Sequence, residues 1–67
     1  MITFQVNDMT CGHCVATITN AVKALDATAT VETDVASHRV NVQSARPAAA
    51  IEAAIRDAGY SPMAAGA

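Results

Sequence analysis

Cys11 and Cys14 are the residues of this chain whose type and spacing could do chemistry. They lie three positions apart in the stretch DMTCGHCV, residues 8–15, with a glycine and His13 between them. Such a pair can exchange electrons, hold part of a structural zinc site, or carry a soft metal ion. A disulfide between them would close almost no loop, so we do not expect it to stabilise the fold. Which chemistry applies depends on the elements that position the two sulfurs.

The length of 67 residues predicts a single domain over residues 1–67. Hydrophobic residues make up 52% of the chain, but sixteen of them are alanine. A domain of this size buries only about 60% of its unfolded surface, so we expect modest stability. The bulkier core candidates are Ile2, Phe4, Val6, Val15, Ile18, Val22, Leu25, Val31, Val35, Val40, Val42, Ile51 and Ile55.

The charge and hydropathy of the chain exclude two classes of partner. A net charge of −2, with four lysines and arginines in total, gives no basic patch for a nucleic acid. The sequence contains no run of about 18 apolar residues, so we expect no membrane insertion. The first residues show no basic region followed by an apolar stretch, and we therefore expect no signal peptide.

The first third of the chain predicts a strand followed by a helix. Residues 2–7 alternate apolar and polar side chains, which is typical of a half-buried strand. Over residues 12–25 the apolar side chains recur at helical spacing. We expect Thr10 to cap the start of this helix through its hydroxyl. Cys11 then lies in the loop and Cys14 in the first helical turn.

The rest of the chain predicts a hairpin, a helix and a short strand. Residues 28–35 and 38–43 read as two strands, which Ala36-Ser37 connects tightly. A second helix starts near Pro47, a favoured first position, and ends before Gly59. Its expected inner stripe is Ala48, Ile51, Ile55 and Ala58. Residues 61–63 can form an edge strand, where proline is permitted, and residues 64–67 read as a frayed tail.

This order gives an α+β fold of the ferredoxin-like βαββαβ type, with two helices on one face of a four-stranded antiparallel sheet. In that topology the loop after the first strand, the hairpin turn and the loop after the second helix lie at the same pole. The residues that the order of elements brings to this pole are Cys11, His13, Cys14, His38 and Tyr60.

The position of the cysteines favours a metal that needs few ligands. Free amides and the positive dipole end at a helix start stabilise thiolates, so we expect lowered thiol pKa values there. A structural zinc needs four ligands, and the chain offers no second CxxC. Two soft thiolates suit a low-coordinate soft ion, for which Cu(I) is the natural candidate. The lowered pKa serves redox chemistry equally well, so that alternative stays open.

The stretch MTCGHC, residues 9–14, resembles the MxCxxC motif of the heavy-metal-associated domain family, in its branch of small copper chaperones of the CopZ and Atx type. The similarity covers nearly the whole chain and includes AGYSP after the second helix. The threonine at position 10 resembles the residue type of the copper branch, since zinc- and cadmium-linked relatives often carry an acidic residue there. Asp8 departs from the pattern, because many members have glycine before the methionine.

The resemblance implies a carrier and not an enzyme. Family members carry Cu(I) on the two motif cysteines, here Cys11 and Cys14, and pass it to metal-binding domains of copper-transporting P-type ATPases. Tyr60 occupies the place of a tyrosine that lies near the site in bacterial members. We expect a cytoplasmic chaperone in copper homeostasis or resistance, and under copper excess a copper-bridged homodimer is an open alternative.

The other residues near the pair have plainer interpretations. Met9 is expected to pack under the loop, not to act as a third ligand. His13 either points to solvent or tunes the site, binds the ion or touches the partner. His38 reads as a solvated turn residue, and Tyr60 either covers the core edge or shields the ion.

Three other functions compete with a copper carrier. The chain could carry Hg(II), Zn(II) or Cd(II), or it could be a metal-binding domain of a larger transporter; the initial methionine favours a stand-alone protein. A thiol–disulfide oxidoreductase is the third. Against it, the chain is too short for a thioredoxin-like fold, and no aromatic residue stands directly before Cys11.

Overall fold

The computed structural model describes residues 2–64. Its elements are β1 (Ile2–Val6), α1 (Gly12–Leu25), β2 (Thr30–Asp34), β3 (Arg39–Gln43), α2 (Ala48–Asp57) and β4 (Pro62–Ala64). The expected order βαββαβ is confirmed, and the strands are one to three residues shorter than expected at their ends except for β4. Neither helix in this part of the chain has the length and apolar character that crossing a membrane requires.

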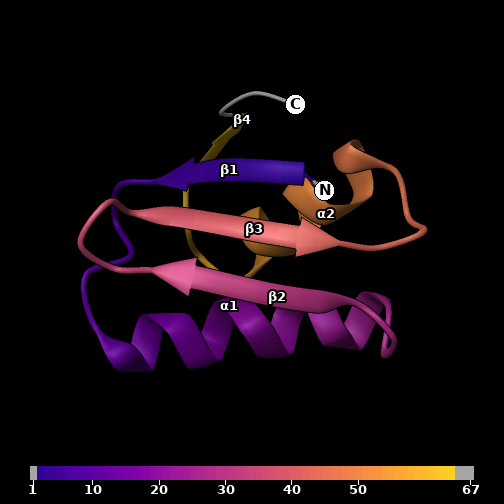
Figure 1. The fold of residues 1–67 in the computed structure, drawn as a ribbon, viewed down its shortest axis with the longest axis horizontal. Coiled ribbons are helices and arrows are strands. Elements are labelled where there is room, and N and C mark those ends of the chain that lie inside the picture. The colour runs from indigo at the N-terminus through magenta and orange to yellow at the C-terminus, as the bar shows by residue number, and fades with distance from the viewer. Residues whose placement is uncertain (1, 65–67) are drawn as a thin grey trace.

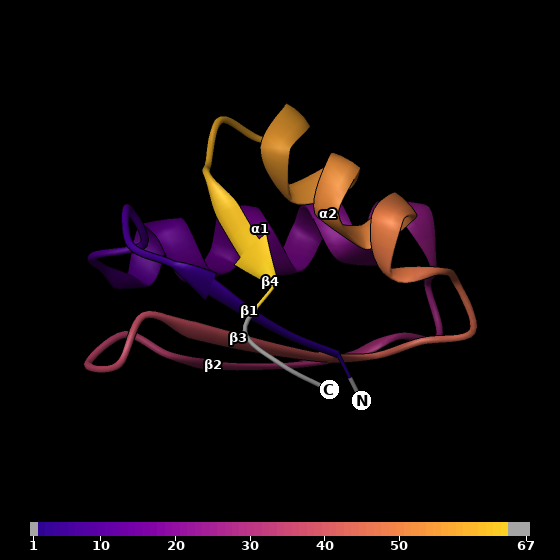
Figure 2. The ribbon, with the colours of Figure 1, turned by 90° about the horizontal axis from the view of Figure 1, so that it is seen from above.

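The four strands form one antiparallel sheet in the order β2-β3-β1-β4. Both helices cover the same face of this sheet and leave the other face open, as Figure 2 shows. The loop between β1 and α1 and the turn between β2 and β3 lie at the same end of the molecule, at the left of Figure 1. The ferredoxin-like prediction is therefore correct, and it places the cysteine loop beside the hairpin turn.

The alternation in β1 explains how the sheet faces the helices. Phe4 and Val6 are buried, whereas the alternate residues Thr3 and Gln5 lie on the outer face of the sheet. In the register, Phe4 pairs with Val40. The fully buried core also contains two residues outside the expected set, Met9 and Ala29. Expected core residues that are only partly buried against it are Ile2, Val15, Leu25 and Val31.

The hairpin turn is longer than the sequence predicts. Asp34 pairs with Arg39, so four residues, 35–38, form the connection instead of Ala36-Ser37 alone. The Asp34 carboxylate accepts hydrogen bonds from the next amides, those of Ala36 at 3.0 Å and Ser37 at 3.4 Å. This local bonding draws the chain out of the ladder. Val35 consequently lies in the turn and not in a strand.

The second helix begins one residue later than predicted and ends as predicted. Pro47 is its N-cap, and Ala48 is exposed instead of contributing to the inner stripe, whereas Ile51 and Ile55 are fully buried. Gly59 follows the helix with φ 97°, the left-handed conformation that glycine adopts without strain. Of the expected tail, Ala64 belongs to β4, and residues 65–67 lie outside the described residues.

Candidate metal centre

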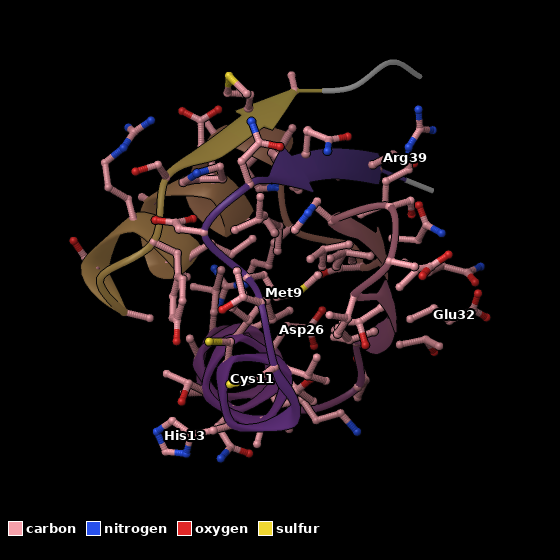
Figure 3. All side chains as sticks on the ribbon, turned by 90° about the vertical axis from the view of Figure 1, so that its left-hand side faces the viewer. Met9, Cys11, His13, Asp26, Glu32 and Arg39 are labelled. Carbon is pink, nitrogen blue, oxygen red and sulfur yellow. The ribbon has the colours of Figure 1, made fainter. Side chains whose placement is uncertain are left out.

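The loop between β1 and α1 is anchored by Met9. Its side chain has no exposed surface and points between the sheet and the helices, as Figure 3 shows. The Met9 amide donates to the carbonyl of Val6 at 3.0 Å, which closes a tight turn directly after the strand. The predicted packing role of Met9 is therefore confirmed, and its buried thioether holds the loop against the core.

The helix starts at Gly12, and Cys11 is its N-cap. Cys11 has extended backbone angles, φ −156° and ψ 172°, and its carbonyl accepts from the amide of Val15 at 3.2 Å. The predicted cap by Thr10 is wrong, because the chain stays extended for one residue more and no side chain caps this helix. A Cβ atom at position 12 would meet nothing within 4 Å, so space does not require Gly12.

The two thiols meet at the start of α1. The sulfur atoms of Cys11 and Cys14 are 3.5 Å apart. Both thiols are free, Cys11 is exposed and Cys14 is partly buried. Figure 3 looks at this end of the helix and shows Cys11 at the surface of the molecule. The spacing of three residues thus brings both sulfurs close enough to bind one ion from outside.

Cys14 is the thiol whose ionisation the structure favours. A hydrogen bond from the Tyr60 side chain, followed by the backbone of Thr10 and the side chain of Cys11, lowers the pKa of Cys14 from 9.0 to about 7. Cys14 in turn raises the pKa of Tyr60, so the phenol keeps its proton and remains a donor. The expected lowering is confirmed for Cys14, although its largest cause is Tyr60 and not the helix start.

The end of α2 positions Tyr60. The amide of Tyr60 donates to the carbonyl of Ile55 at 3.4 Å, and the amide of Gly59 donates to that of Arg56 at 3.0 Å. These two bonds form the Schellman motif, in which a left-handed glycine turns the chain back over the helix end. The next residue, Ser61, donates its amide to the carboxylate of Asp8 at 3.2 Å. Tyr60 is therefore held between its own helix and the cysteine loop.

The two histidines differ in their surroundings. His13 is exposed on the first turn of α1 and points away from the molecule, as Figure 3 shows. His38 is partly buried, and its Nδ1 lies 3.0 Å from the carbonyl oxygen of Met9. The prediction that His38 is a solvated turn residue is therefore wrong. Within residues 2–64 no group of three or more Cys, His, Asp or Glu side chains is placed so that it could hold a metal ion.

Comparison with known proteins agrees with this geometry. The family model described as the heavy-metal-associated domain matches residues 3–61. The chain belongs to this family. A search of the curated proteins gives no match.

Several solved structures are similar to this heavy-metal-associated domain, and two of the three named here are described as metal-binding proteins or copper chaperones. A gold-binding protein is 41% identical, with a TM-score of 0.92 over 96% of this chain and 98% of its own. A mutant of the copper chaperone Atx1 from Synechocystis PCC6803, in a trimeric form, is 35% identical, with a TM-score of 0.92 over 94% and 100% of the two chains. Atu1203 from Agrobacterium tumefaciens is 42% identical, with a TM-score of 0.82 over 88% and 92%.

Proposed function

We propose that residues 1–67 act as one carrier domain that binds Cu(I) on the thiolates of Cys11 and Cys14. The observation that carries this proposal is the pair of free sulfurs 3.5 Å apart at an exposed helix start. The pKa of Cys14, about 7, leaves a substantial part of this thiol deprotonated at neutral pH. Thiolates are the soft ligands that Cu(I) prefers, and two of them satisfy a low-coordinate ion. The copper chaperones among the similar structures support the choice of metal.

Delivery then proceeds by exchange of ligands. Each cysteine binds the ion as a thiolate: any proton still on a sulfur passes to water as the sulfur–metal bond forms, and no electron is transferred. An acceptor thiolate can approach from solvent because Cys11 is exposed. It adds to the ion while one bond to this chain breaks, and the second bond breaks when the next acceptor thiolate adds. We propose a metal-binding domain of a copper-transporting P-type ATPase as the acceptor, in the cytoplasm.

The neighbouring side chains have separate roles in this proposal. The Tyr60 side chain lowers the pKa of Cys14, and in this proposal it favours the thiolate that binds the ion. His13 lies on the exposed surface around the pair, where an approaching acceptor would meet it. Because the pair is exposed, copper excess would let two chains share ions. A trimeric form of a mutant of the similar Atx1 supports association between chains.

The test is a titration of the reduced protein with Cu(I) in the presence of a competing chelator. The wild type should bind one ion tightly. The double variant Cys11→Ser, Cys14→Ser should bind Cu(I) more than about 100-fold more weakly, a larger loss than the replacement of residues that only orient metal ligands causes. Met63→Leu is the matched control, since it removes an exposed sulfur that lies outside the site. Equal affinity in wild type and double variant would contradict the proposal, as would catalytic reduction of a disulfide substrate.

A second cargo has a specific observation in its favour. The gold-binding protein at 41% identity makes Au(I), another soft ion, a candidate for the same two sulfurs. Competition between Cu(I) and Au(I) for the wild-type protein separates the two proposals. A copper carrier binds Cu(I) at least as tightly as Au(I) in this competition. A strong preference for Au(I) would instead make gold the cargo.

A further inference from the structure

His38 makes two contacts with the segment that leads to the cysteines. Its backbone carbonyl accepts from the amide of Val6 at 2.7 Å, and its ring Nδ1 bonds the carbonyl of Met9 at 3.0 Å. A carbonyl oxygen can only accept, so Nδ1 must carry the hydrogen and donate it. His38 thus contacts both ends of the turn between Val6 and Met9 from a position 29 residues away in the chain.

The contacts form a closed set around the turn. The amide of Met9 donates to Val6 at 3.0 Å, Val6 donates to His38, and His38 donates to Met9. Both polar backbone groups of Met9 are therefore engaged, while its side chain is fully buried. Cys11 follows two residues later as the N-cap of α1, so the placement of Met9 sets where the helix and both sulfurs begin.

The backbone of His38 shows that this position is constrained. Its φ of 57° lies in the left-handed region, where a residue other than glycine is strained. A glycine would remove the strain and keep the carbonyl that Val6 uses, but it would lose the bond to Met9. Strained residues persist where surrounding contacts hold them, and they suggest a function for the side chain that is held.

We propose that His38 is a positioning residue for the metal centre. It does not touch the ion. Through Met9 it fixes the loop before α1, and thereby keeps Cys11 and Cys14 at the separation that lets them share one ion. This inference rests on the proposed function, because it takes these two cysteines as the ligands. Residues that orient ligands in this indirect way commonly change metal affinity by about 10-fold to 100-fold when they are replaced.

Two substitutions of His38 separate its side chain from its backbone. His38→Gly removes the donor and relaxes the left-handed backbone. His38→Asn supplies an N–H group at nearly the place of Nδ1 and tolerates the same backbone conformation. Met63→Leu is the control, because Met63 is exposed on β4 and lies outside the metal site. With Cu(I) and a competing chelator, His38→Gly should bind about 10-fold more weakly, and the other two variants should bind like the wild type.

Hydrogen exchange of the metal-free proteins provides a second readout. His38→Gly removes the bond to the Met9 carbonyl, which helps hold the turn closed, so the amide of Met9, which donates to Val6, should exchange about tenfold faster while the amide of Ile55 in α2 keeps its rate. His38→Asn should restore the rate at Met9. A residue that only stabilised the fold would instead speed exchange at Ile55 as well.

The outcomes distinguish a failure of the role of His38 from a failure of the proposed function. The inference is overturned if His38→Gly binds Cu(I) like the wild type, if exchange at Met9 is unchanged, or if Ile55 accelerates equally. If the wild type itself fails to bind Cu(I), the proposed function fails, and exchange at Met9 still shows whether His38 holds the loop.

Discussion

The two ends of α1 each carry an acidic group with a lowered pKa, but for different reasons. At the start, Cys14 has a pKa of about 7 and shares its surroundings with Cys11 and Tyr60. At the end, Asp26 is the C-cap, and its pKa is lowered from 3.8 to about 2. A negative charge is disfavoured at the end of a helix, where the dipole is negative. The carboxylate of Asp26 must therefore be stabilised by something stronger than the dipole.

Hydrogen bonds from the chain itself stabilise Asp26. Its Oδ2 accepts from the hydroxyl of Ser44 at 2.5 Å, and its Oδ1 accepts from the hydroxyl of Thr28 at 2.7 Å and the amide of Thr28 at 3.0 Å. Ser44 lies in the loop between β3 and α2, so its bond joins the end of α1 to that loop. The charge at this end is used inside the fold, whereas the sulfurs at the other end remain open to an ion from outside. The contrast separates an anion that stabilises the fold from one that is available for binding.

The largest expected effect concerns the packing of Met9 beneath the loop that carries Cys11. Met9→Ala should lower the free energy of unfolding by about 2–5 kcal/mol, because it removes a fully buried side chain. Met9→Leu should cost less than about 1.5 kcal/mol, since it nearly conserves volume. Urea unfolding measures both. Met9→Leu should also bind Cu(I) like the wild type, and a large loss of affinity would show that the thioether is a ligand.

At the other end, Asp26→Ala should destabilise the protein at neutral pH and leave Cu(I) affinity unchanged. Because the pKa of Asp26 is lowered on folding, its contribution is fully present above 3.8 and is lost as the pH falls toward about 2. The difference between wild type and variant in urea unfolding should therefore shrink over that range. Ser44→Ala should act in the same direction with a smaller effect. A difference that does not change with pH would contradict this role of the charge.

The smallest expected effect is at Tyr60. Tyr60→Phe removes the main cause of the lowered pKa of Cys14, so this pKa should rise from about 7 toward 9.0. In the metal-free wild type, the stability that comes from this shift is absent below about 7 and appears as the pH rises to 9.0; the variant should lose it. The ultraviolet absorbance of the thiolate, followed against pH, measures the change. Ser61→Ala is the control, and an unchanged midpoint in Tyr60→Phe would show that the phenol does not act on Cys14.

The fold could be predicted from local patterns because the apolar residues that form the core recur at the spacing typical of each helix and strand. Alternation in β1, the stripe of Ile18 and Val22 in α1, and Gly59 after α2 each report on their own element. The topology then placed Cys11 and Cys14 correctly at one pole. These inferences need only short stretches of sequence and a known order of elements.

The errors arose where contacts join distant residues or where a side chain bonds its own backbone. The length of the hairpin turn depends on Asp34, whose carboxylate accepts from the amides two and three residues later, and an aspartate at the start of a turn is a signal that could have suggested it. The contact of His38 with Met9 and that of Asp26 with Ser44 join segments far apart in the sequence. No local pattern reports such distances. The order of elements did bring Tyr60 to the pole of the cysteines, but its effect on the pKa of Cys14 depends on how the two side chains are placed, which that order does not give.

The edges of the sheet affect how two copies of this domain can meet. The outer edge is β2, whose exposed side chains include Glu32 and Asp34, and the opposite edge is β4, which begins with Pro62. If two β2 strands paired antiparallel about their middle residue, one Glu32 would face the other, and like charges in that position repel. Acidic side chains and proline thus discourage lateral aggregation through backbone pairing. At high concentration we expect the molecules not to associate through these two edges of the sheet. The pole that bears the sulfurs is then the surface where two molecules meet.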